Sequence, residues 1–382
     1  MRKVLIIVLL LALASSCARL SQQRWERTYG GTVNGYGHSV QQTKDGGYIV
    51  AGSTYSFGNS GQVYLVKTNA SGDTLWTRTY GGTGEDYGLS VQQTTDGGYI
   101  IAGTTNSFGS GEQVYLVKTN ATGDTLWTKS YGRAGEDYGY SVQQTQDGGY
   151  IVAGETKSFG NARQVYLIKT NASGDTLWTR TYGGPWAQGK SVQQTSDGGF
   201  IITGETYSFG GDWQVYLIKT NATGDTLWSR NYGGTGADNG NSVQQTQDGG
   251  YIVAGETESF GNARQYYLIK TNASGDTLWT RNYGGAGTDE GKSVQQTMDG
   301  GYIVAGWTIS FGNGGQVYLI KTNASGDTLW TRSYGGTDID VGNSVRQTTD
   351  LGYIIAGETN SFGNGYQVYL IKTDKNGFVK SR

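Results

Sequence analysis

Seven tryptophans recur at an almost constant spacing, and this repeat restricts the possible folds more than any other feature of the chain. They stand at intervals of 51, 51, 51, 50, 51 and 51 residues, at Trp25, Trp76, Trp127, Trp178, Trp228, Trp279 and Trp330. Nearly the same amino-acid sequence follows each of these tryptophans. A fixed period near fifty residues, without a helical pattern of apolar side chains, is typical of a propeller or another repeat array.

Each repeat divides into four short segments rich in Val, Ile, Thr, Tyr and Trp, which favour strands. In the second repeat the predicted strands cover residues 90–94, 99–104, 114–119 and 125–131. Asp96-Gly97-Gly98 predicts a tight turn between the first two strands, because glycine supplies the positive φ that such turns require. The repeat therefore predicts an all-β, seven-bladed β-propeller of four-stranded antiparallel blades. A linear β-solenoid is the alternative, although its coils usually repeat at shorter periods.

The two ends of the array predict how the ring closes. At Trp25 the chain begins with a sequence typical of the fourth strand of a repeat, before any first strand. The last predicted strand, at residues 368–373, is a third strand. We expect the N-terminal strand to complete the last blade, so that residues 25–382 form one closed propeller. With one tryptophan at the same position in every blade, we expect these seven side chains to pack between neighbouring blades.

The turn before each tryptophan resembles a known motif. Residues 171–178, Asn-Ala-Ser-Gly-Asp-Thr-Leu-Trp, are similar to the tryptophan-docking motif of propellers related to pyrroloquinoline-quinone dehydrogenases and to outer-membrane assembly lipoproteins. The spacing here is one residue shorter, and Asn replaces Asp except at Asp374. The repeated Asp-Gly-Gly-Tyr-Ile-Val-Ala-Gly also resembles bacterial secreted proteins built from such repeats. The resemblance implies a lipoprotein-type propeller and not the quinone cofactor.

The first residues resemble an export signal. Arg2 and Lys3 precede an apolar run, which ends in small residues before Cys17, the only cysteine of the chain. This pattern resembles the bacterial lipoprotein signal, although Ala14 stands where that motif more often has leucine. It implies a signal peptide at residues 1–16, a lipid on Cys17 and a tether at 17–24. An ordinary secretory signal is the alternative. We expect an exported, cell-envelope protein held at the outer membrane by its lipid alone.

Composition removes several functional classes. With 29 Lys and Arg against 31 Asp and Glu, the chain has no basic excess for nucleic acid. His38 is the only histidine, which excludes a metal site with two histidines and a repeated histidine triad. No catalytic residue and no metal site are assigned, and a non-catalytic protein is favoured. We expect a monomer without a cofactor, although the acidic side chains leave Ca²⁺ open.

The copies differ mainly on one face. The first-to-second and third-to-fourth turns share the nearly constant face, called the invariant face below; the second-to-third loops and the blade-to-blade loops share the divergent face. On the divergent face we counted sixteen acidic and six basic side chains, a formal charge of −10. Confined divergence is typical of a binding surface on a repeated scaffold. The alternative is that the loops of this face are longer and that their sequences vary without a functional reason.

Seven residues are candidate ligand contacts. Six belong to the divergent face, as aromatic or acidic side chains at variable positions: Trp186, Glu205, Trp213, Glu256, Trp307 and Tyr366. The seventh is Arg346, which replaces a glutamine in the innermost strand and would place one cation in the central channel. A solvated arginine without a ligand is the alternative there.

The resulting hypothesis is a membrane-anchored binding or scaffold protein that meets a partner protein through its divergent face. A carbohydrate-binding or carbohydrate-active propeller is the alternative, since exposed aromatic side chains bind sugars and paired carboxylates can hydrolyse glycosides.

Overall fold

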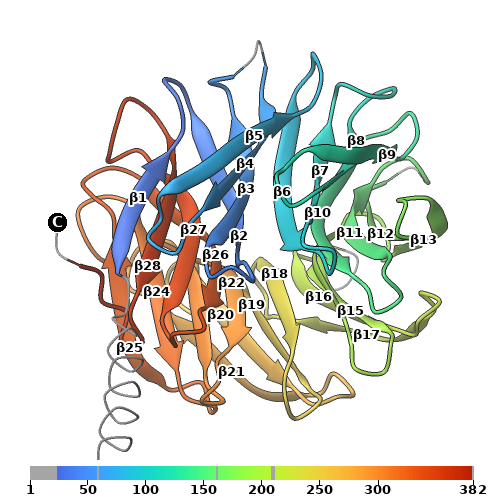
Figure 1. The fold of residues 1–382 in the computed structure, drawn as a ribbon. Coiled ribbons are helices and arrows are strands. Elements are labelled where there is room, and N and C mark those ends of the chain that lie inside the picture. The colour runs from blue at the N-terminus through green and yellow to red at the C-terminus, as the bar shows by residue number, and fades with distance from the viewer. Residues whose placement is uncertain (1–23, 58–59, 161, 208–210, 381–382) are drawn as a thin grey trace, which may run out of the picture.

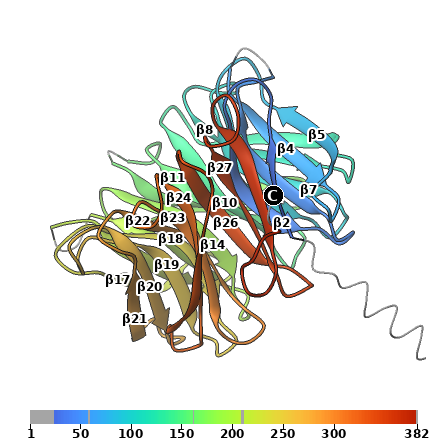
Figure 2. The same cartoon turned by 90° about the vertical axis from the view of Figure 1, so that its left-hand side faces the viewer.

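The computed structural model describes residues 24–380, apart from 58–59, 161 and 208–210. These residues form seven antiparallel sheets of four strands each, arranged radially around a central axis (Figure 1; Figure 2). The fold is the predicted all-β, seven-bladed propeller. Within the described ranges, no helix is long and apolar enough to cross a membrane.

Blades 1 to 6 follow one another along the chain, and each contains four consecutive strands. The first, innermost strands of these blades are β2 (Gly35–Gln42), β6 (Asp86–Gln93), β10 (Asp137–Gln144), β14 (Ala187–Gln194), β18 (Asp238–Gln245) and β22 (Asp289–Gln296). The second strands are β3 (Tyr48–Thr54), β7 (Tyr99–Thr105), β11 (Tyr150–Thr156), β15 (Phe200–Thr206), β19 (Tyr251–Thr257) and β23 (Tyr302–Thr308). The third are β4 (Gln62–Thr68), β8 (Gln113–Thr119), β12 (Gln164–Thr170), β16 (Gln214–Thr220), β20 (Gln265–Thr271) and β24 (Gln316–Thr322). The fourth are β5 (Thr74–Tyr80), β9 (Thr125–Tyr131), β13 (Thr176–Tyr182), β17 (Thr226–Tyr232), β21 (Thr277–Tyr283) and β25 (Thr328–Tyr334).

Blade 7 takes its strands from both ends of the chain. It contains β26 (Asp340–Gln347), β27 (Tyr353–Thr359), β28 (Gln367–Thr373) and, at the outer edge, β1 (Trp25–Tyr29). β1 pairs antiparallel with β28, from Trp25 opposite Lys372 to Tyr29 opposite Val368. The predicted closure of the ring by the N-terminal strand is confirmed.

The innermost strands begin earlier than predicted. In blade 2 the strand starts at Asp86 rather than at residue 90, and it pairs with β7 through Gly88 opposite Gly103 before a bulge. A Cβ on Gly88 would stand 2.9 Å from the carbonyl oxygen of Gly52 in blade 1. The glycines that made this segment look like a loop are therefore strand residues, required because two blades approach closely near the axis.

The core lies between blades rather than within them. One cluster joins Ile49 and Leu65 of blade 1 to Val91, Tyr99 and Ile101 of blade 2, and six similar clusters complete the ring. The second and third strands are buried on both faces, which explains why their sequences are almost continuously apolar.

The repeated tryptophans pack between blades, as predicted, and most of them are only half-buried. Trp25 is buried, whereas the other six are half-buried at the outer ends of their clusters. Trp76 meets Tyr99 of the next blade edge-on at 5.9 Å, and its ring lies under Gly123, where a Cβ would come within 2.8 Å of it. This arrangement is the one expected of a tryptophan-docking turn, and the position on the outermost strand leaves one edge of each indole in solvent.

Candidate binding face

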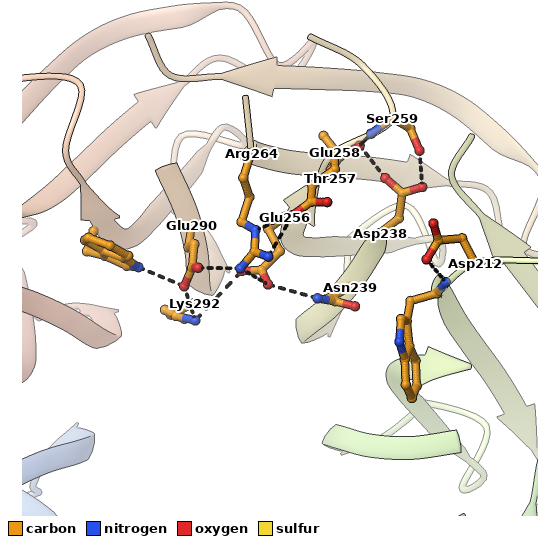
Figure 3. Close-up of polar contacts among 12 residues, drawn as sticks. Asp212, Asp238, Asn239, Glu256, Thr257, Glu258, Ser259, Arg264, Glu290 and Lys292 are labelled. Carbon is orange, nitrogen blue, oxygen red and sulfur yellow. Dashed lines mark hydrogen bonds and ion pairs between the residues drawn. The ribbon is translucent and has the colours of Figure 1, made fainter. Parts of the chain in front are cut away.

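Five acids of the divergent face are structural and do not contribute to its surface. The carboxylates at the starts of five innermost strands have no exposed area: Asp86, Asp137, Asp238, Asp289 and Asp340. Asp238 accepts hydrogen bonds from Thr257 and from Ser259, the latter at 2.5 Å (Figure 3). It accepts a third from the backbone N–H of Gly234. Glu155 and Glu256 are also buried, so the formal charge of −10 counted from the sequence is too high for the surface, on which nine acids remain against six bases.

Arg264 joins blades 5 and 6 on this face. Its guanidinium donates to Glu258 from Nε and Nη2, at 2.9 and 2.7 Å, and to Glu290 of blade 6 from Nη1 at 2.8 Å (Figure 3). Glu256 lies 3.6 Å from the same Nη1. These carboxylates hold the pKa of Arg264 above its usual value against the effect of burial.

Lys292 completes this group of charges near the axis. Its ammonium lies 2.7 Å from Glu290 and 3.8 Å from Glu256 (Figure 3). The indole N–H of Trp307 donates to the same Glu290 carboxylate at 2.8 Å, and Asn239 donates to Glu256 at 2.9 Å. Burial alone would raise the pKa of Glu290, but Lys292, Trp307 and Arg264 lower it below the usual value. We call Glu256, Glu258, Arg264, Glu290 and Lys292 the blade 5–6 charge cluster.

Glutamates occupy the ends of four second strands around the axis: Glu155, Glu205, Glu256 and Glu358. Burial raises the pKa of Glu155 and of Glu205 although Arg163 and Lys190 oppose it. Burial raises the pKa of Glu358 to about 7, and the hydrogen bond from Asn343 at 2.8 Å offsets part of that effect. At three of these copied positions burial thus favours the protonated carboxyl group.

The candidate aromatic residues do not form one patch. Trp186, in the loop between blades 3 and 4, is 51% exposed, with a backbone φ of 69°. Trp213 is half-buried against Tyr207 at 5.8 Å, and Trp307 is half-buried with its N–H engaged. The ring of Tyr366 packs against that of Tyr36 across the junction of blades 7 and 1, with the ring centroids 5.4 Å apart. Among these four candidates, Trp186 is the most exposed.

The structure adds residues that sequence reasoning did not select. Arg264, Lys292 and Glu290 entered the charge count but were not candidate contacts, yet they surround the predicted Glu256 and Trp307. The sequence showed that these positions vary among the copies. It did not show that the three side chains contact one another, because Arg264 and Glu290 belong to different blades.

The described part of the chain offers little to a metal ion. It contains no group of three or more His, Cys, Asp or Glu side chains arranged to hold one. Arg264 and Lys292 already neutralise the densest acidic group.

Arg346 lies apart from the other candidates. It lines a cavity of about 240 Å³ on the axis, together with Gln41, Gln92 and their counterparts from the other blades. Cys17, the signal peptide 1–16 and most of the tether 17–24 lie outside the described residues.

Comparison with known proteins supports the fold. The family model described as "Domain of unknown function (DUF5122) beta-propeller" matches residues 43–74. The structure is similar to the WD40 domain of Pan2 from Neurospora crassa, at 12% identity over 94% of this chain and 98% of that one, with a TM-score of 0.54. It is also similar to Sqt1 from Chaetomium thermophilum, at 11% identity over 87% and 83% of the two chains, with a TM-score of 0.52. No curated protein matches the sequence. The chain is thus a seven-bladed β-propeller similar in fold to WD40 propellers.

Proposed function

We propose that this propeller is a non-catalytic binding protein that holds a partner protein on its divergent face. The observation that carries the proposal is the contrast between its two faces. On the invariant face every blade repeats one ion pair between the third strand and the Asp-Gly-Gly turn, from Lys67–Asp45 to Lys372–Asp350. The divergent face has charge groups that occur once, as in the blade 5–6 charge cluster.

The divergent face combines fixed charges with exposed aromatic side chains, of which Trp186 is 51% exposed. Charged groups held by one another keep their positions before a partner arrives, which lowers the entropic cost of binding. Complementary charges then select the partner and its orientation. Trp186 supplies the type of anchor that contributes most to interfaces. Its left-handed backbone, unfavourable for a residue other than glycine, holds the indole outward.

We also propose that the protein is exported and carries a lipid on Cys17. The chain enters the ring at the invariant face, where Arg24 forms an ion pair with Asp374 at 3.2 Å. A lipid attached seven residues before Arg24 would keep the invariant face close to the bilayer, since seven extended residues reach about 25 Å. The divergent face would then point away from the membrane.

The test compares two similarly exposed apolar residues, one on the divergent face and one on the outermost strand of blade 3, beside the invariant face. Trp186→Ser and Leu177→Ser each remove one exposed apolar side chain. The side chain of Trp186 is 51% exposed, and that of Leu177 is 56% exposed. Cross-linking in cells followed by mass spectrometry identifies partners of the unaltered protein, and purified partners are then titrated against each variant. We expect Trp186→Ser to weaken binding roughly tenfold or more, as expected for an aromatic anchor, and Leu177→Ser to leave it unchanged. Equal loss in both variants would contradict the proposal.

Carbohydrate is the second candidate, because an exposed indole such as Trp186 also stacks on sugar rings. A glycan array with the same two variants separates the possibilities. Binding to defined glycans that is lost only in Trp186→Ser would replace the partner protein by a sugar.

A further inference from the structure

The polar side chains of the innermost strands bind neighbouring blades together. The Ser Oγ of each blade accepts a hydrogen bond from a valine N–H of the next blade, as Ser39 does from Val91 at 3.2 Å. The first Gln of each Ser-Val-Gln-Gln text accepts one in the same direction, as Gln41 Oε1 does from the N–H of Gln93 at 2.6 Å. The same bond recurs at six junctions, always at 2.5 to 2.6 Å.

These bonds determine the orientation of six side-chain amides. A backbone N–H can only donate, so the oxygen of each amide must face it and the NH₂ group must lie on the other side. The six glutamines also line the axial cavity: Gln41, Gln92, Gln143, Gln193, Gln244 and Gln295. Their NH₂ groups are thus the parts left to face that cavity, as a ring of hydrogen-bond donors.

Arg346 occupies the seventh position of this ring. Its Nη1 donates to the carbonyl oxygen of Val345 at 2.9 Å, its one hydrogen bond within the described residues. The lining of the cavity, as far as the structure describes it, contains serines, valines, glutamines and Arg346, and no carboxylate. The guanidinium is therefore a half-buried cation with no carboxylate in the described lining of its cavity, and a charge without such compensation is costly away from bulk water. Burial lowers its pKa accordingly.

We propose that the axial cavity is a binding site for a small oxyanion, held by the guanidinium of Arg346 and the NH₂ groups of the glutamine ring. Every group that faces the cavity in this layer donates hydrogen bonds, and one carries a positive charge. Phosphate, sulfate and carboxylate accept several such bonds at once, and charge-assisted bonds are the stronger kind. A cavity of about 240 Å³ holds such an anion together with several waters. The proposal is independent of the divergent face.

The repeat itself supplies the decisive variant. Arg346→Gln restores the residue found at the other six junctions, so it should fold, and its amide oxygen can accept a hydrogen bond from the N–H of Gln42 as its counterparts do. We therefore expect this variant to unfold at the same or a higher temperature than the unaltered protein in buffer without oxyanions. Arg27→Gln is the matched control, because Arg27 is exposed and, within the described residues, its one hydrogen bond goes to the adjacent Glu26 carbonyl.

Isothermal titration and thermal unfolding with sulfate, inorganic phosphate and acetate, at constant ionic strength in chloride, provide the measurement. We expect saturable binding that raises the unfolding temperature of the unaltered protein and of Arg27→Gln. Arg346→Gln should bind at least roughly tenfold more weakly, and Arg346→Lys should retain part of the affinity. A preference between sulfate or phosphate and acetate identifies the anion class.

Two results would overturn the proposal. One is the absence of saturable binding by the unaltered protein to all three anions. The other is binding that Arg346→Gln leaves unchanged, which would place the anion elsewhere.

Discussion

The phenol hydroxyl of Tyr29, in the first strand of the chain, donates a 2.6 Å hydrogen bond to the carbonyl oxygen of Gly72, in the third-to-fourth turn of blade 1. The same turn covers Trp25, whose indole N–H donates to the carbonyl of Ala70 at 3.2 Å. Tyrosine and glycine repeat this bond at the other six junctions, from Tyr80–Gly123 to Tyr334–Gly377. The N-terminal strand thus makes the same tyrosine–glycine contact as the fourth strands of the other blades.

Removing β1 should therefore open the ring. A chain beginning at residue 30 loses the strand that pairs with β28 and exposes the apolar cluster around Tyr48 and Val368. We expect it to lose at least about 4 kcal/mol of unfolding free energy relative to a chain beginning at residue 24, since the large side chains of Trp25 and Tyr29 leave the core. Urea unfolding followed by tryptophan fluorescence measures the difference. Equal midpoints and slopes for the two chains would show that β1 does not close the fold.

Leu351 and Gly46 occupy the same turn position in different blades. Leu351 has a φ of 68° where the other copies have glycine, and Gly46 has a φ of 82° with space for a side chain. A left-handed conformation costs a residue with a Cβ about 1–2 kcal/mol, which exceeds the entropic cost of glycine. We expect Leu351→Gly to stabilise the protein by up to about 1 kcal/mol and Gly46→Leu to destabilise it by a similar amount. Thermal unfolding of the reciprocal pair is the measurement, and changes of the same sign would refute the explanation.

Lys292 neutralises two carboxylates that are largely buried. Lys292→Met leaves Glu290 and Glu256 with less compensation, and we expect a loss of roughly 2–4 kcal/mol of unfolding free energy. Adding Glu256→Gln to that variant should recover part of the loss. Lys157→Met is the control: it breaks a more exposed pair with Glu136, and we expect a change below about 1 kcal/mol. Chemical denaturation at pH 7 checks all three variants; similar losses from the two lysines would contradict the assigned burial.

Glu358 should make the stability fall as the pH rises from mildly acidic to neutral. Burial raises its folded-state pKa from 4.5 to about 7, so the folded protein binds this proton more tightly than the unfolded chain. Its contribution is complete below pH 4.5 and is lost as the pH rises through about 7, up to about 3 kcal/mol in all. We expect Glu358→Gln to flatten the stability profile across this window and to be more stable than the unaltered protein at pH 8. Unfolding measured from pH 4 to 8 tests this, and a parallel profile in the variant would exclude Glu358 as the cause.

The proposed lipid anchor predicts which face is accessible. Trp186→Cys and Leu177→Cys place single thiols on the divergent face and beside the invariant face, at similarly exposed positions. In lipid-anchored protein on vesicles, we expect a membrane-impermeant thiol reagent to label position 186 faster than position 177, because the bilayer shields the invariant face. Protein released from the lipid should show similar rates at both positions. Faster labelling of position 177 on the vesicles would mean that the disc is inverted.

The architecture could be predicted in advance because each repeat carries its own strand and turn signals. The early start of β6 at Asp86 could not, since Gly88 has the composition of a loop and becomes a strand residue only through the approach of blade 1. The sequence did not indicate how deeply the tryptophans are buried, for a related reason. One tryptophan per blade indicates packing between blades. How much of the indole is exposed depends on its strand being the outermost of the blade, where one edge of the ring faces solvent.

By itself, the sequence determined the number of blades, the strands of each blade and the exchange of a strand at the closure, because these features rest on local patterns repeated seven times. Only the tertiary structure decided which charges are available. Asp238 is fully buried beneath Ser259, whereas Arg264 bridges Glu258 and Glu290 across two blades. It also decided that six glutamine amides turn their donors toward the axis beside Arg346. The physical reason is that burial and hydrogen bonding between blades join residues about fifty positions apart, and no local pattern records which way those side chains face.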